Sequence, residues 1–575
     1  MGRFCGSAPQ RAKRERGHDE MRYMSGSLPT LQHTPRYREP VLWNYIIIVT
    51  MKLSAKNFLA RAQRFVVRPP PGWADVTLDE VRAVLHTPYS KYKFEPVFLN
   101  NASMLNADGN IEILNCDFRQ GMELTTRLMT AHDVQWVVED LQCKEHKDIK
   151  RACFQFPFAI FINPAHSLSD ISIDVRAHAS GSFADSSKML KDFFYEGLET
   201  FGKSNGDAES TRALLRSRKK ASLFDAPVSQ FDLSQKRMFT MKLHNARLTI
   251  TANMCGEPLY KRGFKQQALS GVAPLPEHHA AAAYYWAHNF VFPSSGNAND
   301  SGDSNLSANI CKVGWFRSPA HHPHTVHIPF AGSGTLGIEA LSLILGACPG
   351  SHADRHFLVS NFNQTPASTM DFIRKKNSPA GVTSAPATED DTIILEIDTN
   401  EHAWSKNVVM QFAFSDINAD ALKSTRENVE NFVGSVATKE SSSTDGEQTS
   451  NVFCSFKMFD FLAPGASNKA LVGGKGGKLH HHCVLLNPPY GKRLDTGVSP
   501  IETYRQLSRA VQAMRYCTSN KSLRKDITIS GYCLCPDEAT WKAFSSNQFA
   551  NLFSCKTRHF THGGTDMRVI AFASK

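Results

Sequence analysis

The sequence predicts an α+β first half and, from about residue 251, an α/β second half built on a parallel sheet. In the second half, apolar runs alternate with helix-like segments, as strands and helices do in parallel sheets. Four of those runs end at residues able to contact a ligand: a glycine turn, two carboxylates and an Asn-Pro-Pro-Tyr sequence. The first half mixes helices and strands without a glycine-rich phosphate loop, which favours an α+β arrangement.

The composition limits the class of protein. The chain has 575 residues, a net charge of +11 and an isoelectric point of about 9.0, a mild basic excess compatible with a polyanionic partner. Thirteen cysteines, an odd number without framework spacing, favour reduced thiols in an intracellular protein. The apolar run 41–50 is about half the length that spans a bilayer, so we expect no membrane segment.

The first residues allow two interpretations. Residues 51–68 lack acidic side chains and interleave cationic with apolar ones, which is typical of a mitochondrial targeting helix. The same pattern fits the first helix or edge strand of a folded domain equally well. The first fifty residues are mostly basic, polar and unpatterned, which indicates a disordered extension or sequence upstream of a true start at Met51. We therefore treat residues 1–56 as a disordered or targeting extension, and both cytoplasm and mitochondrion stay open as compartments.

Local patterns predict the elements of the first half. Apolar runs predict strands at 65–67, 111–114, 152–163 and 171–176, and a strand or hairpin at 239–252. Helical spacing predicts helices at 76–85 (with Thr77 as its cap), 123–136 and 187–201. The basic run 216–220 favours a solvated loop over an RNA contact. Segments rich in small and polar residues predict four surface insertions: 293–309, 375–391, 434–451 and 464–478.

A glycine turn follows the first strand of the second half. The chain passes from the run 326–330 through Ala331, Gly332, Ser333, Gly334 and Thr335 into an apolar helix at 336–345. The glycines allow a ligand to approach the backbone, and the helix start offers free N–H groups. The turn has neither a dinucleotide fingerprint nor the lysine of a phosphate loop, so alone it is equally compatible with a simple tight turn.

Carboxylates end the next two strands. Asp416 ends the run 412–416 and precedes a helix at 419–432 that contains Asn428, and Asp460 follows the third run. An acid at the end of the second strand is the usual partner of a ribose hydroxyl pair, although Asp416 could also cap the helix after it.

The fourth run, 484–486, stops at Asn487-Pro488-Pro489-Tyr490. The prolines end the strand because they cannot donate to a sheet, and they leave an amide, a rigid backbone and an aromatic ring at its carboxyl end. Ligands of open α/β sheets bind at that edge. The ordered set of turn, two acids and this segment is far more specific than any member of it.

This ordered set resembles S-adenosylmethionine-dependent methyltransferases that methylate amines. The resemblance implies a cofactor loop formed by Pro329, Phe330 and residues 331–335, with Asp416 at the ribose and Asp460 at the adenine. It also implies that residues 487–490 are catalytic. Where the family has Asp and Cys, this chain has Ile328 and Ala331, so one side-chain contact to the cofactor is lost.

Further matches narrow the resemblance to RNA enzymes. Residues 256–264 and 273–283 resemble the segment that precedes the fold in THUMP-domain methyltransferases. Residues 348–350 and the sequence NPPYGKRL at 487–494 are similar to bacterial enzymes that methylate guanine N2 in large-subunit ribosomal RNA. The implied architecture is a Rossmann-like class I methyltransferase domain at 251–575, a ferredoxin-like domain at 57–115 and a THUMP-like RNA-binding domain at 116–250.

The resemblance implies S-adenosylmethionine-dependent methylation of the exocyclic N2 amine of a guanosine in RNA, with large-subunit rRNA as the first expectation. The alternatives are a tRNA guanine-N2 methyltransferase, methylation of adenine N6 or of a glutamine side chain, and a non-catalytic RNA-binding assembly factor. We expect a monomer that binds RNA and no membrane, and an activator subunit is left open.

The mechanism we hypothesise needs neither a titrating base nor a metal. The Asn487 side-chain oxygen and the Pro488 carbonyl would each accept one N–H of the target amine, while Tyr490 stacks on an extruded base. The amine nitrogen then faces the methyl group for in-line displacement.

Other notable residues favour structural roles. The histidines at 321, 322, 324, 327 and 480–482 lack ligand spacing with cysteines or carboxylates, which favours loop histidines over a metal site. Cys533 and Cys535 would share one face of a strand, which favours packing over a redox pair. The tail 558–572 predicts a closing hairpin with Gly563 and Gly564 at its turn.

Overall fold

The computed structural model describes residues 56–85, 94–98, 109–163, 168, 171–181, 186–205, 233–265, 275–292, 323–352, 355–377, 379, 381–385, 392–398, 409–437, 449–463, 480–489, 499–516 and 527–575. The predictions for nearly all of the extension 1–56, for the basic run 216–220 and for the insertions 293–309 and 464–478 concern residues outside these ranges. Tyr490 also lies outside them.

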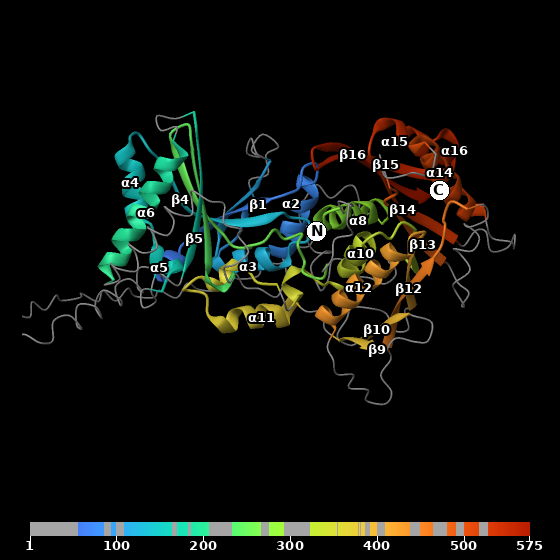
Figure 1. Cartoon of the computed structure of the whole chain (residues 1–575), viewed down its shortest axis with the longest axis horizontal. Helices are drawn as coiled ribbons and strands as arrows, with labels where there is room; N and C mark the ends of the chain where they lie inside the picture. Colours follow the sequence, from blue (N-terminus) through green and yellow to red (C-terminus); the bar gives the residue numbers. More distant parts are fainter. Residues whose placement is uncertain are drawn as a thin grey trace, which may run out of the picture. The chain divides into compact units, whose positions relative to one another are not determined.

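The first half of the chain builds one seven-stranded sheet with the strand order β2-β3-β1-β4-β7-β6-β5 (Figure 1). Neighbouring strands are antiparallel except β5 and β6, which are parallel. Strands from the predicted ranges 57–115 and 116–250 share this sheet, and the division between two domains stays a prediction. The strands are β1 (Gln63–Arg68), β2 (Val97–Phe98), β3 (Ile111–Cys116), β4 (Asp133–Gln142), β5 (Ser172–Ser180), β6 (Lys236–His244) and β7 (Arg247–Asn253).

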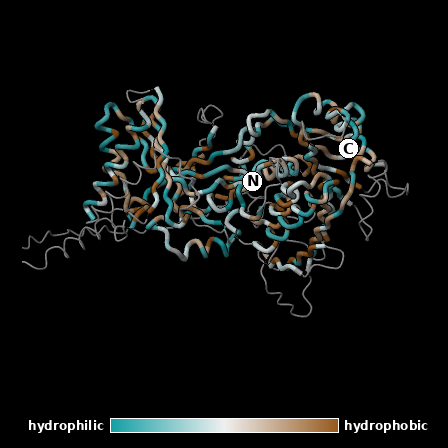
Figure 2. The backbone as a smooth tube through the Cα atoms, in the orientation of Figure 1, coloured by the Kyte–Doolittle hydropathy of each residue, from teal (hydrophilic) through white to brown (hydrophobic). Residues whose placement is uncertain are grey.

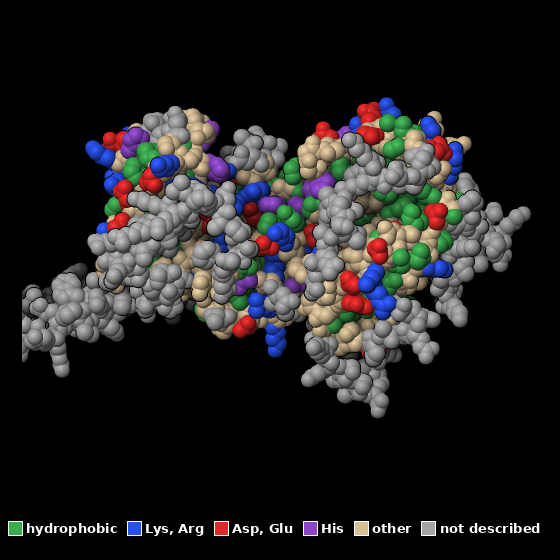
Figure 3. All heavy atoms as spheres, in the orientation of Figure 1, with side chains coloured by type: hydrophobic (Ala, Val, Ile, Leu, Met, Phe, Trp, Pro, Cys, Tyr) green, Lys and Arg blue, Asp and Glu red, His purple; other side chains and the backbone are tan. Residues whose placement is uncertain are grey.

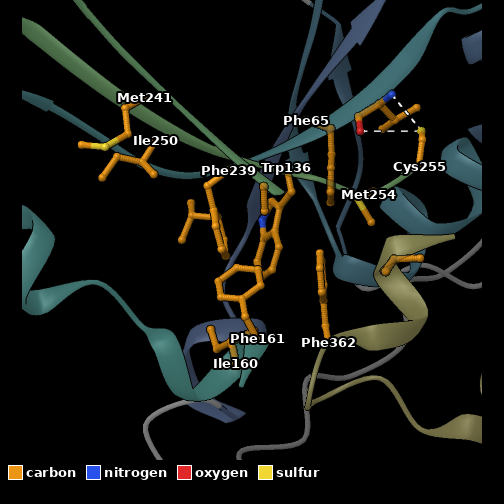
Figure 4. Packing of buried hydrophobic residues seen from close by; sticks show 14 of the residues in the cluster. Phe65, Trp136, Ile160, Phe161, Phe239, Met241, Ile250, Met254, Cys255 and Phe362 are labelled. Carbon is orange, nitrogen blue, oxygen red and sulfur yellow. Dashed lines mark hydrogen bonds between the residues drawn. The ribbon is translucent and has the colours of Figure 1, made fainter. Parts of the chain in front are cut away.

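One face of this sheet is buried. Phe65, Trp136 and Phe239 project from it toward Phe161 and Phe362, and the Trp136 and Phe161 ring centroids are 5.5 Å apart (Figure 4). Phe362 belongs to the second half of the chain, so the apolar core of the sheet takes in residues from both halves. The helices of the first half are α2 (Ala74–Leu85), α3 (Phe118–Arg127), α4 (His146–Gln155), α5 (Phe158–Phe161) and α6 (Ser187–Ser204).

The predicted helix at 123–136 is confirmed over 123–127 and wrong beyond that. Helix α3 ends at Arg127 and strand β4 begins at Asp133. The helix starts earlier than predicted because Asp117 and Gln120 form a capping box, in which each side chain accepts the backbone N–H of the other residue.

The predicted strand at 152–163 and the predicted cap Thr77 are also wrong. Residues 152–163 form the end of α4 and the short helix α5, separated at Phe156-Pro157. A short apolar run does not distinguish a strand from a buried helix. Thr77 lies inside α2, where its hydroxyl donates to the carbonyl of Thr130. The other elements predicted for this half are confirmed, including the hairpin β6–β7.

The second half forms a nine-stranded sheet with the order β15-β16-β14-β13-β8-β11-β12-β10-β9. Its five central strands, β14-β13-β8-β11-β12, are parallel, and the order reverses around β8. They are β8 (Thr325–Ile328), β11 (Val409–Asp416), β12 (Thr449–Met458), β13 (His480–Leu486) and β14 (Ile527–Cys535). The antiparallel strands are β9 (Val382–Ala385), β10 (Ile393–Asp398), β15 (Phe553–His562) and β16 (Thr565–Ser574).

Helices pack on both faces of this sheet, and two separate apolar clusters lie between the helices and the strands. Hydrophobic stretches run along strands of both sheets (Figure 2). The predicted closing hairpin is confirmed as β15–β16. The helices are α8 (Glu277–Val291), α10 (Thr335–Leu345), α11 (Ala367–Asn377), α12 (Ala419–Val436), α14 (Pro500–Tyr516), α15 (Glu538–Phe544) and α16 (Asn547–Leu552), with short 3₁₀ turns at Pro349–Ser351 and Leu358–Asn361.

Two of the predicted insertions are partly wrong. The range 375–391 contains the end of α11 and strand β9, and the range 434–451 contains the end of α12 and the start of β12. Strand β9 was not predicted because of the polar composition of its segment. Among the described strands it lies at the edge of the sheet and pairs with β10. No helix among the described residues is long and apolar enough to cross a membrane.

Buried polar contacts join the two sheets. Arg262 pairs with Glu339 of α10, with 1% and 0% of the side chains exposed, and also donates to the carbonyl of Met129. On the surface, Arg558 makes a two-pronged contact with Asp75 of α2. The helix that begins at the glycine turn is therefore fixed to the first half of the chain.

Candidate active site at the carboxyl edge of the second sheet

Three adjacent strands end at one level. The register pairs Ile328 of β8 with Phe414 of β11, and His327 with Val484 of β13. Phe330, Asp416 and Asn487 follow these paired residues by two or three positions, so they lie at the same edge of the sheet. Strands lie about 4.8 Å apart, so the ends of β11 and β13, on either side of β8, lie roughly 10 Å apart. The predicted residues of the first, second and fourth strand ends are thus brought together.

The glycine turn has a backbone that only glycine adopts readily. Gly332 has φ +56° and Gly334 has φ +80°, and Gly334 is also the N-cap of α10. A Cβ on Gly334 would lie 3.1 Å from Cγ2 of Thr425, whereas a Cβ on Gly332 would meet no described atom within 4 Å. The turn is packed on one side and open at Gly332, where a ligand can approach the backbone.

Asp416 fixes the turn to the end of β11. Its Oδ2 accepts the N–H of Gly332 at 3.0 Å, and its Oδ1 accepts the N–H of Asn418 at 3.0 Å. A carboxylate offers about four acceptor positions, so capacity remains for a ligand hydroxyl.

Asp416 is not the cap of the following helix. The side chain of Asn418 fills that role, accepting the backbone N–H groups of Asp420 and Ala421. The carboxylate of Asp416 therefore holds the glycine turn and can accept hydrogen bonds from a ligand bound at that turn.

Two side chains of α12 complete the turn. The Thr425 hydroxyl donates to the carbonyl of Gly332 at 2.9 Å, and the Asn428 amide donates to the carbonyl of Ser333 at 3.0 Å. Both side chains are buried. Asn428 was noted in the predicted helix without a role, and Thr425 was not predicted as a site residue. Their spacing of three residues on one helix face, just after the acid, was the available signal.

Apolar side chains stand beside the two acids. Ile417 and Met458 are 63% and 62% exposed, the highest values for large hydrophobic residues in the described part of the chain. Met458 lies opposite Asp416 in the strand register. Asp460 is exposed, and its Oδ1 accepts the N–H of Leu462 at 2.9 Å. Exposed apolar groups next to polar ones are typical of ligand sites. Neither residue was predicted, although Ile417 follows Asp416 and Met458 lies two residues before Asp460.

Asn487 directly follows the buried end of β13. Its Oδ1 is buried and has no hydrogen-bond partner among the described residues. Such an acceptor costs about 1–3 kcal/mol unless a partner arrives. Pro488 is buried and Pro489 is exposed. The segment therefore presents a desolvated acceptor, positioned by rigid backbone, to a ligand with an N–H group.

The two departures from the family pattern leave apolar side chains in the core. Ile328 is fully buried in the cluster between α10 and the sheet, and Ala331 is 5% exposed. The N–H of Ala331 donates to the carbonyl of Ser415 at 3.0 Å. Neither residue disturbs the conformation at Gly332.

No family model matches the chain. Among curated proteins it is similar to the ribosomal RNA large subunit methyltransferase K/L of Shewanella sediminis (strain HAW-EB3), with 23% identity over 278 residues. The match covers 48% of this chain but only 28% of that protein, so the chain spans little more than a quarter of its relative's length.

Solved structures match over most of the chain. SMU.472, a methyltransferase candidate in complex with SAH, superposes with a TM-score of 0.53 at 13% identity, over 90% of this chain and 99% of its own. A predicted N6-adenine-specific DNA methylase from Listeria monocytogenes gives 0.52 at 14% identity, over 91% and 97%. The second half of the chain has a Rossmann-like fold, shared with these solved structures. The predicted fold of the second half is confirmed, and the THUMP assignment of the first half stays a prediction.

His327 of β8 and His481 and His482 of β13 are buried rather than in loops, which corrects the prediction for these three residues. His321 and His322 lie outside the described residues. His327 Nε2 lies 3.0 Å from His482 Nδ1, and His481 Nε2 lies 2.7 Å from the Ser530 hydroxyl. Strand pairing, which local sequence does not show, places them in the interior. In the described ranges, no three His, Cys, Asp or Glu side chains are grouped to hold a metal ion. The predicted shared face of Cys533 and Cys535 is confirmed, because both lie in the same apolar cluster.

The buried histidines predict a loss of stability in acid. Burial lowers the pKa of His327 to about 3 and that of His481 to about 4, whereas an unfolded histidine titrates near 6.5. Below pH 6.5 the unfolded chain therefore binds more protons, and each such histidine lowers the free energy of unfolding by roughly 1.4 kcal/mol per pH unit. Burial raises the pKa of Glu80 and Glu339 to about 7, which opposes this trend.

Urea unfolding at pH 7.0 and 5.5 measures the effect. We expect His481→Asn, which keeps a polar group near Ser530, to lose less stability between the two values than the unaltered chain. Equal losses in both proteins would show that His481 does not titrate as its burial implies.

Proposed function

We propose that this protein transfers the methyl group of S-adenosylmethionine to the exocyclic N2 amine of a guanosine in RNA. The observation that carries the proposal is the buried Oδ1 of Asn487, which has no hydrogen-bond partner among the described residues and lies at the same sheet edge as a glycine turn that an acid fixes in place. The resemblance of residues 487–494 to large-subunit rRNA enzymes supports guanine and rRNA as target.

The cofactor pocket would be formed by the turn and the two acids. The open side of Gly332 suits the close approach of a methionine portion, and the spare acceptor positions of Asp416 suit the ribose hydroxyls. Ile417 and Met458 would cover the faces of the adenine, with Asp460 at its edge. S-adenosylmethionine supplies an electrophilic methyl group when it is bound.

The chain's own contribution is to prepare the amine. An exocyclic amine is a poor nucleophile because its lone pair is delocalised into the ring. The Oδ1 of Asn487 and the carbonyl of Pro488 would each accept one N–H, which directs the lone pair out of the ring plane. As positive charge develops on the nitrogen, these fixed acceptors stabilise it without reorganisation. Tyr490 would stack on the extruded base.

The first half of the chain would bind the RNA, as the resemblance to THUMP-domain enzymes implies. Transfer RNA is the alternative target, since related enzymes with both modules act on it. A non-catalytic RNA-binding factor is favoured by Ile328 and Ala331 alone, because these residues remove a contact to the cofactor. Both residues pack in the core and leave Gly332 open, which supports the enzyme.

Two measurements test the proposal together. Calorimetry with S-adenosylmethionine should detect binding, and its absence would leave the non-catalytic factor. Separated rRNA and tRNA from cells that lack the protein are then incubated with the protein and S-adenosylmethionine, and their nucleosides are analysed by mass spectrometry. We expect new N2-methylguanosine in the large-subunit rRNA. Its appearance only in tRNA would support the alternative target, and no methylation in either fraction would refute the proposal.

A further inference from the structure

The face of the seven-stranded sheet opposite its aromatic core contains a hollow of about 310 Å³. The hollow is lined by residues of β1, β4, β6 and β5, with β7 between β4 and β6 in the sheet, and by Asn110 just before β3. Along these strands, outward side chains alternate with the core residues. Its size falls at the lower end of ligand sites, which are about 300–1,000 Å³. On the molecular face shown in Figure 3, Lys and Arg are interspersed with Asp and Glu rather than forming a broad basic surface.

One end of the hollow is lined by acceptors without partners. The Oδ1 of Asn110 and the Oδ1 of Asp133 are buried and accept no hydrogen bond from any described residue. Their residues are only 8% and 6% exposed. The other oxygen of Asp133 accepts from Arg68 at 2.8 Å, so the carboxylate is held in place while its Oδ1 stays available. Two fixed acceptors suit a ligand edge with N–H donors, such as a base with an exocyclic amine.

The opposite end is cationic. Arg176 and His178 of β5 lie beside Thr240 and Lys242 of β6 in the parallel register, and all four line the hollow. Arg176, His178 and Lys242 are exposed, and Arg176 pairs with no carboxylate in the described part of the chain. Arginine and lysine suit phosphate oxygens, and a histidine ring can stack on a base.

We propose that this hollow binds a short unpaired segment of RNA, with a base edge at Asn110 and Asp133 and phosphates at Arg176 and Lys242. The proposal rests on the proposed function and names the surface through which the first half of the chain would hold the substrate. Single-stranded RNA suits it because bases outside a helix expose the edges that such acceptors bind.

The test measures binding of labelled ten-nucleotide C, A and U strands to the full chain by fluorescence anisotropy across a salt series. R176Q/K242Q should weaken binding of all three strands by at least about tenfold and reduce the slope of log affinity against log salt by about 1.4, since each phosphate contact to a single strand contributes about 0.7. The matched control, K150Q/K203Q, also removes two exposed positive charges. Its lysines belong to α4 and α6 and do not line the hollow.

Asn110→Ala tests the other end. It should reduce the preference for C and A strands over U, which lacks an exocyclic amine, and leave the salt slope unchanged. An R176Q/K242Q protein that binds as the control does would overturn the proposal. So would displacement of the strand by free CMP at equal molar affinity, which would indicate a mononucleotide site. Either failure leaves S-adenosylmethionine binding and methyl transfer untouched, whereas failure of the proposed function would appear in those two measurements.

Discussion

Asn487→Ala is expected to reduce methyl transfer at saturating substrate by at least about 100-fold, while the affinity for S-adenosylmethionine changes by less than threefold. Removal of one preorganised group that stabilises transition-state charge typically costs about 10²–10³ in rate. The Oδ1 of Asn487 is such a group, because it is desolvated and has no partner among the described residues. The cofactor residues on the other side of the glycine turn do not depend on it for hydrogen bonds.

Single-turnover rates with excess RNA and calorimetry with S-adenosylmethionine separate these two effects. Asn487→Asp is the matched variant, since it keeps an acceptor oxygen at the same position and should retain more activity than Asn487→Ala. If Asn487→Ala turned over at the normal rate, the amide would not be catalytic. If instead it lost cofactor affinity in proportion to its rate, the amide would belong to the cofactor pocket.

The sequence was sufficient to locate the residues of the candidate site because each of them lies in a local sequence pattern. Each parallel strand is a short apolar run that stops at a turn or proline, so Asp416 and Asn487 could be located at strand ends before the strand order was known. Because the strands were predicted to be parallel, their carboxyl ends were expected at one edge of the sheet, which placed Asp416 and Asn487 together.

The missed features depend on contacts distant in sequence. Thr425 donates a hydrogen bond to the glycine turn, 93 residues away in the sequence. Nothing in the neighbouring sequence distinguishes it from other threonines in helices. The buried positions of His327 and His482 follow from the pairing of β8 with β13, which lie far apart along the chain. The unpartnered Oδ1 of Asn110 is evident only once neighbouring strands are in place.

The two halves of the chain also share an apolar core, which was not predicted when each half was treated as a separate domain. Residues between α10 and β11, including Phe357 and Phe362, pack into the core of the first sheet. Asn377 at the end of α11 donates to the Thr126 hydroxyl of α3 at 3.1 Å. The apolar composition of a segment predicts that the segment is buried. It does not predict which element the segment packs against, and the structure is needed to show that.

Arg262→Met is expected to lower the free energy of unfolding by about 3–5 kcal/mol, the usual cost of removing one partner from a buried ion pair. The guanidinium donates to both oxygens of Glu339 and to backbone carbonyls at Leu259 and Met129. Without it, the carboxyl of α10 would be buried without its ion-pair partner, and Lys265 would be the remaining nearby cation that lowers its pKa. Burial already raises the pKa of Glu339 to about 7 against the opposing effect of Arg262, so the variant should raise that pKa further.

This pKa makes the loss dependent on pH. The pKa of the Glu339 carboxyl is higher in the folded chain than its unfolded value of about 4.5, so the folded chain binds the proton more tightly. The stability that this carboxyl contributes is therefore present at low pH and falls as pH rises toward the folded pKa. Urea unfolding should therefore show a larger deficit for Arg262→Met at pH 8 than at pH 5.5. The double variant R262M/E339Q removes the buried charge and should lose the pH dependence. A deficit that is equal at both pH values in the single variant would mean that lost packing, rather than the stranded carboxyl, is the cause. Because α10 begins at the glycine turn, the same measurements on cofactor-bound protein show whether the junction between the two sheets also supports the site.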